Sequence, residues 1–110
     1  MNYQHEGLAA GRWNQLTFLE QMANVGSEVE RALNWRARNH PAYAQRAFER
    51  ALELLDFTLA GVQSPARLRE LARVREALVD FFVGSNLYVA THASWSRYFS
   101  PFTYAARRTR

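Results

Sequence analysis

The residue types most suited to chemistry lie close together in one short stretch, NWRARNHPAY, residues 34–43. It holds Arg36, Arg38 and His40, and a guanidinium beside an imidazole can bind a phosphate and transfer a proton. Pro41, however, disfavours the helical conformation for the residue before it, so a helix should end at this point. We therefore predict a structural role, in which Arg36 and Arg38 stabilise the negative end of a helix dipole and His40 lies in a solvated turn.

The alternative for this stretch is catalysis. Ribonucleases of the HEPN superfamily, which are small helical bundles, carry an Arg and a His near a helix end, and the stretch resembles them in residue type. It departs from them in spacing, because only three residues separate Arg36 from His40. No G-x-S-x-G or S-x-x-K motif offers a nucleophile elsewhere in the chain. We expect no catalytic residues.

Five carboxylates form a second candidate site, because they fall on two expected helices and could hold Mg²⁺. They resemble the acidic residues of the all-helical nucleotide pyrophosphatases of the MazG type. That family pairs two acidic motifs, and only Glu53 with Asp56 has the matching spacing here. We therefore predict no metal and no cofactor, and expect solvated helix faces with intrahelical pairs such as Glu70 with Arg73. The five carboxylates are Glu49, Glu53, Asp56, Glu76 and Asp80.

The chain contains no lysine, so its basic residues apart from histidine are all arginines, and these are unevenly distributed. Residues 65–110 carry eight arginines against three acids, whereas residues 1–64 carry six against seven. Aromatic residues interleave with arginine in the last segment, a composition typical of single-stranded nucleic acid binding. We predict that any nucleic acid contacts this half. The candidate residues are Arg67, Arg69, Arg73, Arg97, Arg107, Arg108 and Arg110.

Apolar residues recur with helical periodicity along most of the chain and predict four helices. Because the connecting loops are short, neighbouring helices should run antiparallel. We predict an all-α, up-down four-helix bundle with a kinked or broken fourth helix, interrupted at Pro101. The expected ranges are an N-terminal strap at 1–16, helices at 17–38, 41–60 and 65–83, and a broken helix at 91–108, all in one domain of residues 1–110.

Local signals mark where these helices begin and meet. Thr17 and Glu20 have the spacing of a capping box. Ser64 and Pro65 combine an N-cap residue with a proline in the first helical position. Gly26 interrupts an apolar stripe, and we predict that another helix crosses close to it.

Composition narrows the class of protein further. The chain has 110 residues, of which 48% are hydrophobic, enough for one core. It has no cysteine, no apolar run long enough to span a membrane and no signal-peptide pattern, so we expect a cytoplasmic protein without membrane contact. The chain has a group of large aromatic side chains that a bundle of this size does not readily bury. The apolar surface left exposed predicts a homo-oligomer. These residues are Trp95, Tyr98, Phe99 and Phe102.

Three segments resemble a family of small, uncharacterised prokaryotic all-helical proteins. This resemblance implies no particular activity. They are GRWNQLTFLEQMANVGSEVERALNWR, RALELLDFT and RLRELARVREALVD, at residues 11–36, 50–58 and 67–80. In size, basicity and helix count the chain is also similar to the four-helix-bundle accessory proteins of diversity-generating retroelements and of ribosomal RNA intervening sequences. That similarity implies a ring-forming, non-catalytic protein associated with nucleic acid.

The expected function is therefore that of a non-catalytic binding or scaffolding protein. Its partner is expected to be a second copy of the chain or another protein, with RNA or DNA as a further candidate. The alternative is a small helical hydrolase that acts on RNA or nucleotides.

Overall fold

Five helices follow one another in the computed structural model, which describes residues 11–108. They are α1 (Gly11–Asn14), α2 (Phe18–Ala37), α3 (Pro41–Gly61), α4 (Pro65–Phe82) and α5 (His92–Arg108). No strand occurs within this range, so the all-α prediction is confirmed. The four predicted helices correspond closely to α2 through α5. Of the predicted strap, residues 1–10 lie outside the described part, and α1 carries the buried Trp13.

The starts of α2 and α4 follow the predicted capping signals. Thr17 Oγ1 accepts a hydrogen bond from the Glu20 backbone N–H at 3.1 Å, and the Glu20 carboxylate accepts one from the Thr17 N–H at 2.9 Å. At the start of α4, Ser64 Oγ accepts from the Arg67 N–H at 3.4 Å. Each such cap stabilises a helix by about 1 kcal/mol. The start of α3 differs, because the side chain of its N-cap, His40, makes no capping hydrogen bond.

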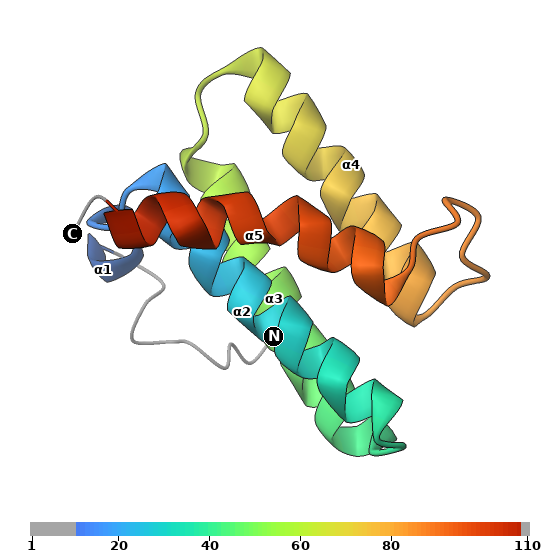
Figure 1. Cartoon of the computed structure of the whole chain (residues 1–110). Coiled ribbons are helices and arrows are strands. Elements are labelled where there is room, and N and C mark those ends of the chain that lie inside the picture. Colours follow the sequence, from blue (N-terminus) through green and yellow to red (C-terminus); the bar gives the residue numbers. More distant parts are fainter. Residues whose placement is uncertain (1–10, 109–110) are drawn as a thin grey trace.

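The helices α2 and α3 lie side by side and run in opposite directions (Figure 1). Three small side chains, those of Ala44, Ala47 and Ala51, are buried on α3. The residues that this pair contributes to the hydrophobic core are Met22, Val25, Val29, Ala32, Leu33, Ala47, Phe48, Ala51, Leu54 and Leu55. This pair supplies most of the core.

The last helix, α5, crosses α2 at Gly26 (Figure 1). A Cβ atom added to Gly26 would lie 2.8 Å from Cβ of Phe99, which is closer than real Cβ contacts allow. The predicted close crossing at this glycine is confirmed. Because α5 crosses α2, an up-down four-helix bundle is not confirmed.

The last helix is not broken as predicted, since α5 continues through Pro101 to Arg108, and a kink is not confirmed. Proline has no N–H, so the Arg97 carbonyl loses its usual helical donor. Both Pro101 and Arg97 are exposed, so the freed carbonyl belongs to a solvent-exposed face of the helix.

Aromatic side chains and ion pairs join α4 to the other helices. Phe82 stacks on Phe48 of α3 with ring centres 4.8 Å apart, and Phe81 meets Trp95 of α5 edge-on at 6.3 Å. Arg75 of α4 donates to Asp56 of α3 at 2.7 Å. This ion pair between Arg75 and Asp56 therefore links α4 to α3.

Two sequence-based assignments of apolar residues are wrong. Trp95 and Phe99 are buried, and Tyr98 and Phe102 are half-buried, so these rings do not form the exposed surplus that predicted an oligomer. Leu68 has the apolar spacing that predicts burial for the helix at 65–83, but it is 44% exposed. Over residues 11–108, no helix is long and apolar enough to cross a membrane.

Candidate functional site

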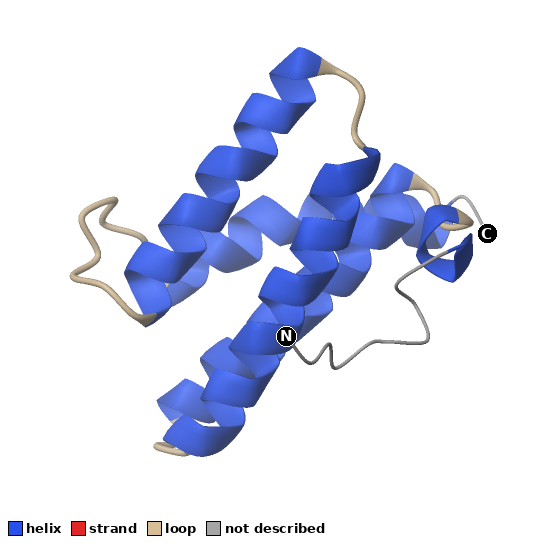
Figure 2. Cartoon of the chain, turned by 180° about the vertical axis from the view of Figure 1, so that it is seen from behind, coloured by secondary structure: helices blue, strands red, loops and turns tan. Residues whose placement is uncertain are grey.

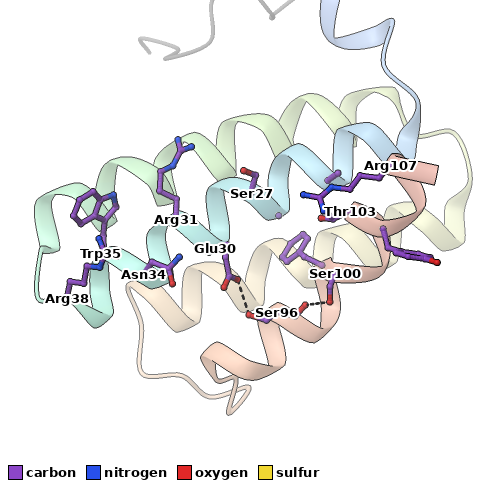
Figure 3. Close-up of a pocket in the computed structure, with 14 residues that line it drawn as sticks. Ser27, Glu30, Arg31, Asn34, Trp35, Arg38, Ser96, Ser100, Thr103 and Arg107 are labelled. Atoms are coloured by element: carbon purple, nitrogen blue, oxygen red, sulfur yellow. Dashed lines mark hydrogen bonds between the residues drawn. The ribbon is translucent and has the colours of Figure 1, made fainter. Parts of the chain in front are cut away.

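An open groove with a volume of about 850 Å³ runs between α2 and α5 (Figure 3). One wall comes from α2 and its C-cap, mainly through Ser27, Glu30, Arg31, Asn34, Trp35 and the C-cap residue Arg38. The facing wall comes from α5, mainly through Ser96, Ser100, Thr103, Tyr104 and Arg107. Both walls are rich in polar side chains.

Each wall arises from residues that share one face of its helix. On α5, Ser96, Ser100, Thr103 and Arg107 follow one another at spacings of four, three and four. The same spacings connect Ser27, Arg31 and Asn34 of α2 with Arg38, the residue that caps the C-terminus of α2. Spacings of three and four place side chains on one helix face. Each stripe therefore begins with a serine and ends with an arginine.

The groove stays open because the helices diverge from one close contact. Gly26 of α2 lets Phe99 approach, and the small or hydroxylated residues beside that contact fill little space. Since α2 and α5 run in roughly opposite directions, their terminal arginines lie apart. Figure 3 shows Arg38 at one end of the groove and Arg107 toward the other.

Positive charge dominates the groove. Its lining includes three arginines but a single carboxylate, that of Glu30. Glu30 is engaged within the groove, since it accepts a hydrogen bond from Ser96 Oγ at 2.9 Å and lies 3.3 Å from His92 Nε2. Arg31 pairs with Glu28 at 3.2 Å, but Arg50 shares that carboxylate at 3.1 Å. The groove therefore carries a net positive charge.

Aromatic rings accompany the arginines at both ends. Trp35 is half-buried, and its ring centre lies 4.9 Å from that of Tyr43. The guanidinium carbon of Arg38 lies 5.6 Å from the ring centre of Trp35. At the other end, Tyr104 is 64% exposed and has the Arg108 guanidinium 5.7 Å from its ring. Both guanidinium distances fall within the range of cation–π contacts.

Of the predicted arginines that the structure describes, Arg107 lines the groove and the others lie outside its lining. Arg67 covers the Phe18 ring at 3.9 Å, at the start of α4. The exposed guanidiniums of Arg69, Arg73 and Arg97 have no ion pair with any residue of the described range. Arg110 lies outside the described residues. These assignments to nucleic acid stay predictions.

The stretch around His40 does not bring its arginine and histidine to one site. Arg36 turns toward α4, where its Nη1 donates to the Phe81 carbonyl at 3.1 Å and its guanidinium lies 4.8 Å from the Phe81 ring centre. His40 is exposed and instead meets Trp35 edge-on, with ring centres 5.3 Å apart. Arg36 thus ties the end of α2 to α4, in addition to any effect on the helix dipole.

The five carboxylates of the second candidate site are also separated. Asp56 pairs with Arg75, and the hydrogen bond to Asp56 raises the pKa of Arg75. Glu76 accepts from the Tyr88 hydroxyl at 3.0 Å, and this contact raises the pKa of Tyr88. Within residues 11–108, no three His, Asp or Glu side chains are grouped so as to hold a metal ion.

Tyr98 is the most strongly perturbed titratable group of the described chain. Its hydroxyl donates to Glu70 at 2.6 Å and so joins α5 to α4. Burial, followed by this hydrogen bond, raises the pKa of Tyr98 well above its ordinary value. The expected pairing of Glu70 with Arg73 is replaced by this contact between helices.

The chain matches no protein-family model, no curated protein and no solved structure. Its function must therefore be inferred from its own residues and geometry.

The sequence pattern does not predict most of the groove. It indicates a helix-end role for Arg38 and no role for Arg31, Asn34 or Tyr104. The repeated spacing of four, three and four was a usable signal on each helix. It could not show that the two stripes face each other, because that depends on the contact between Gly26 and Phe99.

Proposed function

We propose that the chain is a non-catalytic nucleic-acid-binding protein whose groove between α2 and α5 takes a single strand of RNA or DNA. The observation that carries this proposal is the position of Arg38 and Arg107 at opposite ends of one groove, with an aromatic ring beside each end. Arginine forks bind phosphate oxygens, and successive phosphates of a strand need cations distributed along its path.

The aromatic rings favour a single strand over a duplex. Trp35 and Tyr104 can stack on unpaired bases, and such stacking contributes about 1–3 kcal/mol per base. Bases in a duplex are already stacked on one another and cannot use these rings. Asn34 and the hydroxyl groups of Ser100 and Thr103 add donors and acceptors for sugars and base edges.

The similarity in size, basicity and helix count to accessory proteins of diversity-generating retroelements is consistent with this proposal, because those proteins associate with nucleic acid. It is a similarity of architecture alone. The role of the groove therefore needs a direct test.

The first prediction concerns the arginines at the ends of the groove. Arg38→Gln combined with Arg107→Gln should flatten the dependence of log affinity on log salt by about 1.4, since each phosphate contact to a single strand contributes about 0.7. Fluorescence anisotropy with short labelled single-stranded RNA and DNA, measured over a range of salt, gives this slope. The matched control is Arg69→Gln with Arg73→Gln, which removes equal charge from α4 and should leave the slope unchanged.

The opposite pattern, with the α4 variant flattening the slope and the groove variant without effect, would place the contact on α4. Absence of saturable binding at low salt, where these contacts are strongest, would remove nucleic acid as a partner. Intrinsic fluorescence adds a second readout. Trp13 and Trp95 are buried and Trp35 is the remaining tryptophan, so quenching by a bound base should report on the groove.

A further inference from the structure

The loop between α4 and α5, residues 83–91, presents apolar side chains to solvent. Val83 is 65% exposed, Leu87 80% and Val89 78%. The loop protrudes from the body of the molecule in both views (Figures 1 and 2). Its sequence, VGSNLYVAT, contains no charged residue. Exposed apolar side chains grouped on one short loop are typical of a contact site.

Hydrogen bonds hold this loop in one conformation. The Asn86 side chain donates to the Ala90 carbonyl and accepts from the Ala90 N–H, both at 2.9 Å. The Tyr88 N–H donates to the Asp80 carboxylate at 3.1 Å, and the Tyr88 hydroxyl donates to Glu76 at 3.0 Å. The apolar side chains are thus presented from an organised backbone, which lowers the entropy cost of binding.

The backbone of the loop is strained at Val89. Its φ is 54°, in the left-handed region, where a β-branched residue is a rare outlier. Asn86 also has a positive φ, of 58°, but asparagine tolerates that conformation. A loop that only connects two helices could use glycine or asparagine at both positions. A strained valine with an exposed side chain points instead to a role for that side chain.

We propose that this loop is a self-association surface, at which the loops of two copies of the chain pack against each other around a two-fold axis. A two-fold contact sets the same patch against itself, so it must be self-complementary. An uncharged apolar loop meets that requirement, whereas a charged one would repel its copy. This inference does not rest on the proposed binding of nucleic acid.

Charge also argues against a lipid surface as the occupant. Glu76 and Asp80 of α4 lie beside the loop, since Tyr88 donates a hydrogen bond to each, and their negative charge disfavours the anionic head groups of a membrane. The size of the loop sets the expected strength of the dimer. A few side chains supply less area than the roughly 800 Å² per partner of a standard interface, so the dimer should be weak and dissociate on dilution.

The second prediction tests this surface by mass. Wild-type protein should approach a dimer mass at high concentration in sedimentation velocity and light scattering. Leu87→Glu should raise the dimer dissociation constant by about a hundredfold or more, because each dimer loses two buried leucines and gains two like charges. The matched control, Leu68→Glu, changes an exposed leucine at the opposite end of α4 and should leave the dissociation constant unchanged.

Mixing two variants tests the symmetry. Leu87→Glu and Leu87→Arg should each be monomeric, and an equal mixture should form a heterodimer only if the two loops face each other. Circular dichroism checks that each variant keeps its helices. A monomeric wild type, an unaffected Leu87→Glu variant or a mixture that stays monomeric would each overturn the proposal. Co-sedimentation of monomeric wild type with neutral phosphatidylcholine vesicles would assign the loop to lipid instead.

Discussion

Gly26 shows how one residue sets the relation between two helices. The space that its side chain would occupy holds Phe99, whose Cβ, Cγ and Cδ1 atoms lie within 3.0 Å of the position a Gly26 Cβ would take. Both the crossing of α5 over α2 and the groove beside that crossing follow from this contact. A glycine inside a helix lowers the stability of that helix by about 1 kcal/mol relative to alanine.

The third prediction is that Gly26→Ala destabilises the protein. Overpacking against Phe99 should cost about 1–3 kcal/mol, and the better helix propensity of alanine offsets about 1 kcal/mol of that. We expect a net loss of about 1 kcal/mol in the free energy of unfolding, measured by urea denaturation. Gly11→Ala is the control, because no atom lies within 4 Å of its added Cβ. Equal stability of the two variants would contradict the close crossing.

At the scale of the element, the loop between α4 and α5 combines strong local hydrogen bonding with a strained residue. Asn86 closes the turn onto Ala90, while Val89 holds a left-handed conformation that it disfavours. The loop therefore keeps its shape at some cost to the stability of the single chain.

The fourth prediction follows from this strain. Val89→Asn should stabilise the monomer by about 1 kcal/mol, because asparagine accepts a left-handed conformation and Val89 is too exposed to lose burial. Urea denaturation in a Leu87→Glu background removes any contribution from dimerisation. Val83→Asn is the matched control, since Val83 is also exposed but has a negative φ of −120°, and it should bring no gain. A destabilised Val89→Asn variant would show that the loop is not strained there.

For the whole molecule, the attachment of α4 depends on a few specific contacts with α2, α3 and α5. One of them, the hydrogen bond between Tyr98 and Glu70, involves a phenol whose pKa is raised in the folded state. The folded chain therefore holds this proton more tightly than the unfolded chain does. Its contribution to stability is present below the unfolded pKa, about 10, and is lost as the pH rises from there toward the folded pKa.

The fifth prediction is a loss of stability in alkali. Between about pH 9 and pH 11 the free energy of unfolding should fall, and Tyr98 should account for less than about 1 kcal/mol per pH unit, because the side chain is only part-buried and solvent screens it. Tyr98→Phe should remove this part of the decline. Glu70→Gln should remove less of it, since burial is the larger cause of the raised pKa. Urea denaturation across this range measures the effect, and an unchanged slope in Tyr98→Phe would contradict it.

The sequence by itself determined the helices and their starting points. The Thr17 capping box, the Ser64 cap and the apolar periodicity act over a few neighbouring residues, so local hydrogen bonding and side-chain spacing were enough to predict α2 through α5. It also indicated that some helix crosses at Gly26. It could not identify Phe99 as the contact, because many apolar residues compete for one glycine.

Tertiary structure alone decided which side chains share a surface. Trp95 and Phe99 were expected to remain as excess apolar surface, but the crossing of α5 buries them. The same crossing sets the polar stripe of α5 opposite that of α2, and the groove exists only through that juxtaposition. Helix formation depends on contacts four residues apart, whereas the groove depends on residues about seventy positions apart, whose relative placement follows from the packing of the whole core.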